Sequence, residues 1–358
     1  MPANGDAAEH AAAAGLRHVS DADPGIHRVG TAPKFRYVDN DGAPVRDRDT
    51  LDRIRMLAIP PAYTDVWICA DPRGHLQATG RDGRGRKQYR YHSRWRHVRG
   101  EGKFARLVAF GEALPKLRRT LRRDLALPGY PCGKVLAIAV AVMAETLLRI
   151  GNDEYARSNH SYGLTTLRNQ HVAFLRGGRA RFRFRGKSGR RQEVVLDDAR
   201  LARLLRHCQH LPGQALFQYV DDEGAVQPVD SGLVNDYLHD AMGADFTAKD
   251  FRTWGATLLA IRRLASTPLP EPWREGEPRS ERSLAIVEKR VVEDVAAMLG
   301  NTPTVCRNSY IDPAVFAGWR DGRLQKAAAG ATGERQWEQA ALRFLRAARR
   351  GKRTTRRG

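Results

Sequence analysis

Helical periodicity recurs along most of the chain after Phe104, and this feature restricts the fold more than any other. Apolar residues that recur every three or four positions give each helix one stripe facing a shared core, so the pattern predicts a mainly α-helical domain. The segments concerned are residues 104–127, 134–150, 198–211, 230–242, 247–265 and 282–299. Residues 135–144 are apolar throughout, but this run is about half of the roughly 20 residues that a membrane span needs. We interpret it as a buried core helix and expect no membrane partner.

One stretch inside the helical part predicts a small sheet instead. Residues 171–175, 179–185 and 190–196 are typical of three strands joined by glycine-rich turns. In the middle strand Phe182 and Phe184 alternate with arginines, so one face packs on the domain and the other presents guanidinium groups. Lys187 falls in the second turn. A lysine at such a tip is usually solvated, but a flexible tip can also bring an ammonium group into a groove to protonate a leaving group, and the spacing fits both interpretations.

The chain before Phe104 is broken into shorter pieces. Strands are indicated at 35–38, 66–69 and 76–79 and a helix at 50–58, with Asp-Gly, Pro-Pro and Arg-Gly pairs between them. The sequence therefore predicts an α+β protein. We divide it into a disordered extension (1–24), a β-sheet-rich domain (25–103), a mainly helical domain with a three-stranded sheet (104–320), and a tail that is first helical and then basic (321–358). The extension has no basic n-region and is not a signal peptide. A proline-rich insertion is indicated at 267–278.

The charge balance favours an acidic partner. The chain has 61 Lys and Arg against 40 Asp and Glu, a formal net charge of +21 and a pI near 10.4. Nucleic acid fits this balance, although a solvated basic surface encoded by a GC-rich genome fits it too. The cysteines at 69, 132, 208 and 306 form no C-x-x-C pair, which argues against a zinc site or a disulfide framework. A reducing, cytoplasmic compartment agrees with this cysteine usage.

Tyr310 is the most suggestive single residue. The pair Leu299-Gly300 ends one predicted helix, Thr302-Pro303 begins the next, and Asn301 stands at that entrance. Tyr310 then lies two turns into a short helix that Ile311-Asp312-Pro313 ends. A lone tyrosine there is usually a packing residue. A phenol attacks phosphate only when nearby cations stabilise the charge at phosphorus and lower the phenol's pKa.

Two arginines could supply such cations. Arg252 follows a predicted N-cap at Thr247 and a capping-box Asp250, so it lies near the positive end of a helix. It can equally be an ordinary surface arginine. Arg149 ends the apolar helix, where it either complements the negative helix end or is partly desolvated and therefore partnered.

Taken together, these residues resemble the type IB DNA topoisomerases, specifically the small branch shared by poxviruses and many bacteria. The resemblance covers residues 25–316. It depends on the order and spacing of six motifs, at 80–92, 148–151, 163–167, 186–187, 249–255 and 309–310.

The resemblance implies a role for each motif. Tyr310 would be the nucleophile, Arg149 and Arg252 would clamp the non-bridging oxygens, and Lys187 would be the general acid toward the 5′ oxygen. Asn301 stands where many relatives carry histidine, so it can donate a hydrogen bond but brings no charge. The implied reaction makes a 3′-phosphotyrosine in one strand, allows rotation and reseals the strand, without ATP, cofactor or required metal.

The resemblance also implies how DNA is held. A monomer would clamp supercoiled duplex DNA in the cytoplasm, at the bacterial nucleoid. The DNA-contacting residues would be Arg86, Lys87, Gln88, Tyr89, Tyr91 and Lys249. Strand alternation puts Tyr89 and Tyr91 on one face of their strand. The two rings can bind DNA or can instead be an aromatic pair packed on this domain's own core.

Two alternative functions stay open from the sequence. A tyrosine recombinase uses the same chemistry, but that family prefers H-x-x-R around its second arginine, whereas this chain has Lys249 three residues before Arg252. A non-catalytic basic DNA-binding protein would not need the tyrosine, the lysine and both arginines at this spacing.

Overall fold

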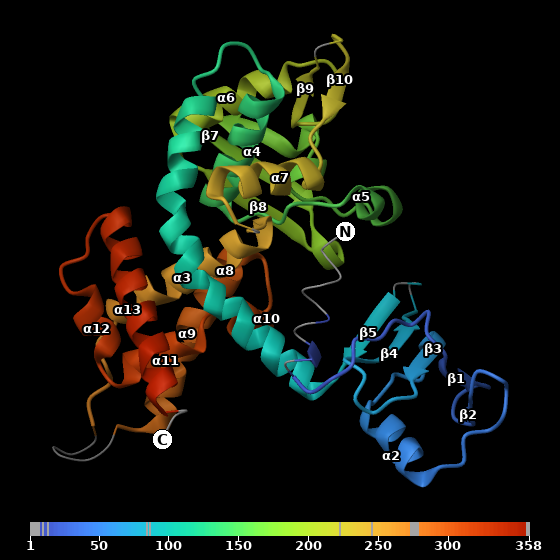
Figure 1. Cartoon of the computed structure of the whole chain (residues 1–358). Coiled ribbons are helices and arrows are strands. Elements are labelled where there is room, and N and C mark those ends of the chain that lie inside the picture. The colour runs from blue at the N-terminus through green and yellow to red at the C-terminus, as the bar shows by residue number, and fades with distance from the viewer. Residues whose placement is uncertain are drawn as a thin grey trace. The chain divides into compact units, whose positions relative to one another are not determined.

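A computed structural model describes residues 8, 11–12, 14–83, 85, 87–221, 223–244, 246–272 and 279–355, and the side chains of these except 96–103, 105, 158 and 351–355 (Figure 1). The chain divides into two compact units, Met1–Lys103 and Phe104–Gly358. Each unit has its own core, and each is described by itself below.

The first unit is built on an antiparallel five-stranded sheet with the order β2-β1-β3-β4-β5. Its elements are β1 (Gly25–Val29), β2 (Arg36–Val38), α2 (Arg48–Met56), β3 (Thr64–Cys69), β4 (Leu76–Arg81) and β5 (Lys87–Tyr91). Alternate residues of the central strands face inward, so Ile26, Val66, Ile68 and Ala78 form a core with Ile54 of α2. β5 is an edge strand of this sheet.

The residues just before this sheet differ from the disordered extension that we expected. Arg17 forms a bridge with Gly74, and Leu16 packs with Trp95 in a small apolar cluster. Asp21 accepts a hydrogen bond from Thr79 Oγ1 at 3.0 Å. These contacts join residues far apart in the sequence, so local composition does not reveal them. Residues 1–7, 9, 10 and 13 of the expected extension lie outside the described residues.

The second unit is centred on α4, whose residues Val135 to Val140 are all buried. Its helices are α3 (Ser93–Asp124, which begins in the first unit), α4 (Cys132–Thr146), α5 (Asp153–Asn159), α6 (Ala199–Gln209), α7 (Ser231–Met242), α8 (Ala248–Ala265), α9 (Glu281–Leu299), α10 (Pro303–Ser309), α11 (Pro313–Arg320), α12 (Arg323–Ala328) and α13 (Glu334–Thr355). The apolar run is thus a core helix, as predicted. In the part of the chain that the structure describes, no helix is both long and apolar enough to cross a membrane.

The predicted three-stranded sheet is present, as β6 (Val172–Leu175), β7 (Arg179–Arg185) and β8 (Arg191–Leu196) in that order. Phe182 and Phe184 are buried while Arg183 and Arg185 are exposed, which confirms the predicted alternation. A two-stranded hairpin of β9 (Gln218–Val220) and β10 (Val226–Pro228) was not predicted. Of the proline-rich insertion, residues 273–278 lie outside the described residues.

The end of the chain is more regular than we predicted. We expected the helical pattern to dissolve into the basic run after Arg349, but α13 continues to Thr355. α11, α12 and α13 lie side by side in the orange and red part of Figure 1. Phe344 and Leu345 of α13 are buried, and the Phe344 ring lies against Gly318 of α11. The helix is therefore part of the core of the second unit rather than an appendage.

Candidate active site

Arg149 is positioned by a short segment beyond the end of α4. We placed this arginine at the end of the apolar helix, but α4 ends at Thr146, and Leu147 adopts a left-handed conformation with φ 53°. At Leu147 the chain therefore turns out of the helix, and Arg149 O accepts a hydrogen bond of 2.7 Å from Leu164 N. A Cβ on Gly163 would lie 2.5 Å from Gly151 N, which explains why this contact uses glycine.

Arg252 ties two helix ends together. It lies in the second turn of α8, after the predicted capping box of Thr247 and Asp250, which the structure confirms. Its side chain is buried and donates to Leu299 O at 2.9 Å and to Leu147 O. These carbonyls are at the C-terminal ends of α9 and α4, where no helical partner remains for them. Burial lowers the pKa of Arg252 and the Tyr310 phenol partly offsets this, but a guanidinium stays protonated.

Tyr310 lies against Arg252. The guanidinium carbon of Arg252 is 5.2 Å from the centre of the Tyr310 ring. Burial alone would raise the pKa of the phenol, but the charge and hydrogen bond of Arg252 and the charges of Arg149 and Lys249 outweigh it, and the pKa lies below its ordinary value. Tyr310 is the C-cap of α10 rather than a residue inside that helix, as we had placed it, so its backbone begins the chain reversal toward α11.

Asn301 faces the same place from the start of α10. The Arg149 guanidinium donates to Asn301 Oδ1. Because a guanidinium has no acceptor, the amide must turn its oxygen to Arg149 and its nitrogen the other way. Within the described residues, Asn301 Nδ2 and Arg252 Nε are buried donors without a hydrogen-bond partner. A buried donor left in this state costs about 1–3 kcal/mol, so this part of the site is suited to an added anionic oxygen.

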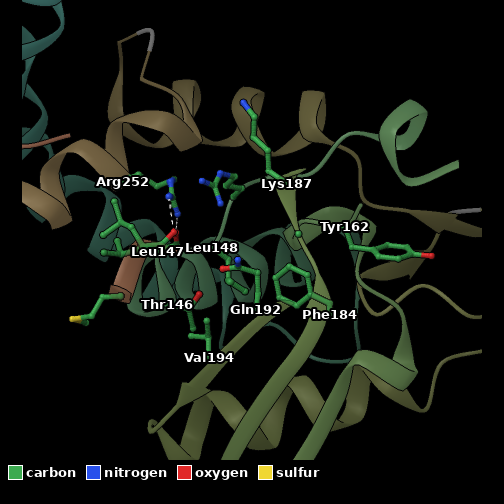
Figure 2. A pocket seen from close by; sticks show the side chains of 13 residues that line it. Thr146, Leu147, Leu148, Tyr162, Phe184, Lys187, Gln192, Val194 and Arg252 are labelled. Carbon is green, nitrogen blue, oxygen red and sulfur yellow. Dashed lines mark hydrogen bonds between the residues drawn. The ribbon is translucent and has the colours of Figure 1, made fainter. Parts of the chain in front are cut away.

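Lys187 lies on the rim of the same pocket as both arginines. The pocket is lined by residues of α4, the β7–β8 hairpin, α8 and α9, including Arg149, Lys187, Gln192 and Arg252. Figure 2 shows Lys187 and Arg252 along its upper edge, above Thr146 and Gln192. Lys187 is exposed, and its turn includes Ser188 with φ 63°, so the tip is a tight turn with a solvated lysine. The structure thus places Arg149, Lys187 and Arg252 in the lining of one pocket.

Comparison with known proteins identifies the family to which this site belongs. The family model for the catalytic core of eukaryotic DNA topoisomerase I matches residues 92–318, which include Arg149, Lys187, Arg252, Asn301 and Tyr310. The chain belongs to the type IB DNA topoisomerases. A second family model, the N-terminal domain of bacterial DNA topoisomerase IB, matches residues 34–82 of the β-rich unit.

Viral relatives support the same assignment. The DNA topoisomerase 1B of Acanthamoeba polyphaga mimivirus is 34% identical over 293 residues, which are 80% of this chain and 85% of the viral protein. The DNA topoisomerase I of Monkeypox virus is 20% identical over 278 residues, 74% of this chain and 80% of that protein. These matches confirm the resemblance and the α+β fold. The type IB topoisomerase relaxes DNA through a transient break in one strand, and the recombinase and non-catalytic alternatives are not favoured.

The DNA-contact residues expected in the first unit of the topoisomerase lie on the edge strand β5, apart from Arg86, which is outside the described residues. Tyr89 is 49% exposed and Tyr91 is half-buried against the cluster of Trp95. Their rings stack at 6.1 Å. The pair therefore has one member on the domain's own core and one presented to solvent.

The polar neighbours on β5 are partly engaged within their own unit. Lys87 pairs with Asp21, and Gln88 Nε2 donates to Asp82 Oδ2 at 2.9 Å. In the second unit, Lys249 is exposed on the first turn of α8, where its charge acts on the Tyr310 phenol. The charge of Lys249 thus adds to those of Arg252 and Arg149 in lowering the pKa of Tyr310, with a smaller contribution than either arginine.

Sequence reasoning missed the residues that hold the Tyr310 backbone. Thr257 Oγ1 donates to Tyr310 O at 3.0 Å and accepts from Asp312 N at 3.2 Å. Sequence reasoning also missed Glu288, which is buried on α9 and forms ion pairs of 2.6 Å with Arg307 and with Arg320. Glu288 had a signal in the sequence, because it is a carboxylate in the apolar stripe of its helix. The hydroxyl of Thr257 had none.

Proposed function

We propose that Tyr310 is the nucleophile of this topoisomerase. The phenol gives up its proton to solvent, and its oxygen attacks a backbone phosphorus of one DNA strand, forms a bond to the 3′ phosphate and displaces the 5′ oxygen. Lys187 gives that oxygen a proton, so the leaving group departs as a hydroxyl. Resealing runs the same steps backward: Lys187 takes the proton of the 5′ hydroxyl, the 5′ oxygen displaces Tyr310, and the released phenolate regains a proton from solvent. The observation that carries this proposal is the contact of Arg252 with the Tyr310 ring, together with the phenol pKa held below its ordinary value.

The cations beside Tyr310 stabilise the charge that builds up at phosphorus. Arg149 and Arg252 supply the fixed guanidinium groups, and the buried Arg252 Nε and Asn301 Nδ2 are donors that a phosphate oxygen would satisfy. Donors held in place before the reaction need no reorganisation, and each is worth about 2.7–4 kcal/mol in comparable sites. Asn301 contributes a neutral hydrogen bond where many relatives use histidine. The two arginines therefore carry more of the stabilisation in this chain.

The β-rich unit, residues 25–103, is proposed to close a clamp on supercoiled duplex DNA. Support comes from the exposed Tyr89 on an edge strand and from the net charge of +21. Lys87, Gln88 and Tyr91 would contact DNA on this side, and Lys249 on the side of the second unit. The enzyme would act as a monomer at the bacterial nucleoid in the cytoplasm. Binding mainly through phosphates weakens steeply with salt and shows modest sequence preference.

A plasmid assay tests the proposal. Purified protein is incubated with supercoiled plasmid in EDTA without nucleotide. We expect relaxed topoisomers from the unaltered chain, whereas recombined products or retardation without relaxation would each contradict this function. Tyr310→Phe should bind the plasmid with unchanged affinity and form no covalent adduct. Cleavage by that variant would show that Tyr310 is not the nucleophile.

A further inference from the structure

The segment that follows Tyr310 is buried and ends in a carboxylate. Ile311 and Asp312 are both buried, and Asp312 is the N-cap of α11, accepting from Ala314 N through Oδ1 at 2.9 Å. The backbone nitrogen of Asp312 donates to Thr257. One carboxylate oxygen is thus used by the cap. The other, Oδ2, is ion-paired with Arg349 of α13.

Arg349 contacts two elements at once. Besides Asp312, its guanidinium donates to Phe104 O of α3 at 2.9 Å. The helix that carries it is also held just before Arg349, because Phe344 packs against Gly318, and Arg346, one turn before Arg349, donates through Nε to Glu112 of α3 at 2.9 Å. Arg349 therefore contacts residues 310–312, the nucleophile segment, at Asp312, from a helix that is packed on α3 and α11. It lies beyond residue 318, where the match to the family's catalytic core ends.

We propose that Arg349 is a positioning residue for the cleavage reaction, acting through Asp312 to hold Tyr310 in line with the phosphate. This inference rests on the proposed role of Tyr310. Among the described residues, Arg349 is the cation paired with Asp312, and a buried carboxylate that loses such a partner is destabilised and moves toward water. That movement shifts the backbone two residues after the nucleophile. A displacement of about 1 Å can slow a reaction about 100-fold, so the last helix, which looked like a basic tail, is part of the catalytic apparatus.

The structure offers a matched control for this proposal. Arg346→Ala and Arg349→Ala each remove one charge from α13 and one ion pair, but only Arg349 touches the nucleophile segment. We expect Arg349→Ala, in the full chain, to cleave a duplex about 10- to 100-fold more slowly than Arg346→Ala under single-turnover conditions with saturating enzyme. Affinity for DNA should be equal in the two. Asp312→Asn, which keeps an oxygen for the α11 cap, should reproduce the loss, and Arg349→Lys should recover part of the rate.

A second substrate separates positioning from proton donation. When the 5′ bridging oxygen is replaced by sulfur, the leaving thiolate needs no proton, so Lys187→Ala should cleave this substrate near the unaltered rate. Arg349→Ala should stay slow on it, because attack by a misplaced phenol is unaffected by the leaving group. The double variant Arg349→Ala with Asp312→Asn should be no slower than either single variant, since both break one contact.

The results that would overturn the inference are distinct from those that would overturn the function. If Arg349→Ala cleaves like Arg346→Ala, or if its defect disappears on the sulfur substrate, Arg349 does not position Tyr310. If Arg349→Ala does not fold, the cleavage rates of Arg349→Lys and Asp312→Asn test the proposal instead. Unaltered cleavage rates in both variants would show that the contact of Arg349 with Asp312 does not position Tyr310. Cleavage by Tyr310→Phe would instead sink the proposed nucleophile, whatever Arg349 does.

Discussion

Replacing Thr257 by valine should loosen the nucleophile segment without changing the shape of the core. Thr257 is 1% exposed, and its hydroxyl is the partner of both Tyr310 O and Asp312 N. Valine has nearly the same volume but puts a methyl group where the hydroxyl stood. Two main-chain groups would lose a hydrogen bond, and the Asp312 N–H does so where it is buried.

The size of the effect follows from these two groups. A buried backbone group left unsatisfied costs about 1–3 kcal/mol, and Tyr310 O is only partly buried, so the free energy of unfolding should fall by roughly 2–4 kcal/mol. At about 2–4 °C per kcal/mol for a unit of this size, the melting temperature should drop by roughly 5–15 °C. Single-turnover cleavage should slow by about 10-fold or more, because the backbone of Tyr310, the proposed nucleophile, is no longer held.

Calorimetric melting and single-turnover cleavage measure the two effects, with Thr253→Val as the control. Thr253 is also buried on α8, but the one hydrogen bond of its hydroxyl among the described residues is donated to Lys249 O of the same helix, at 3.2 Å. That variant should melt within about 2 °C of the unaltered protein, and Thr257→Ser should retain most of the cleavage rate. If Thr257→Val melts and cleaves like Thr253→Val, the hydroxyl bridge does not hold Tyr310 and the reasoning is wrong.

Three further changes test the electrostatics of the site. Lys249→Gln removes a charge that lowers the pKa of Tyr310, so that pKa should rise. The pH at which the phenol loses its proton and cleavage becomes faster should then be higher. Lys289→Gln, on the exposed side of α9, should leave the pH dependence of cleavage unchanged. Arg252→Lys should slow cleavage about 10²- to 10³-fold with DNA affinity retained, because one ammonium cannot serve two carbonyls and a phosphate; a loss below about 10-fold would contradict this. Asn301→Asp should cleave more slowly than Asn301→Ala, since a carboxylate replaces the donor that is proposed to face the phosphate. Equal single-turnover rates would show that Nδ2 does not face it.

Local patterns predicted the elements whose signals lie within a few residues. The capping box before Arg252, the Thr302-Pro303 start of α10 and the strand alternation around Phe182 are all as predicted, because each is decided by neighbouring side chains. The left-handed end of α4 at Leu147 is different. No glycine marks it, and the conformation is supported by Arg252, which binds the Leu147 carbonyl from another helix. Because this helix end was not predicted, we had placed Arg149 in the helix, whereas it lies beyond the helix end.

From the sequence came the groups proposed for the chemistry, a phenol, two guanidiniums and an ammonium, through their resemblance to the motifs of the family, and the periodicity that predicts a largely helical second domain. Tertiary structure decided how these groups are held. The contact of Arg252 with Tyr310, the turn of the Asn301 amide toward Arg149 and the ion pair of Arg349 with Asp312 each join distant parts of the chain. Such contacts arise because helices bury their apolar faces in one core, and the polar groups brought together there must find partners among themselves.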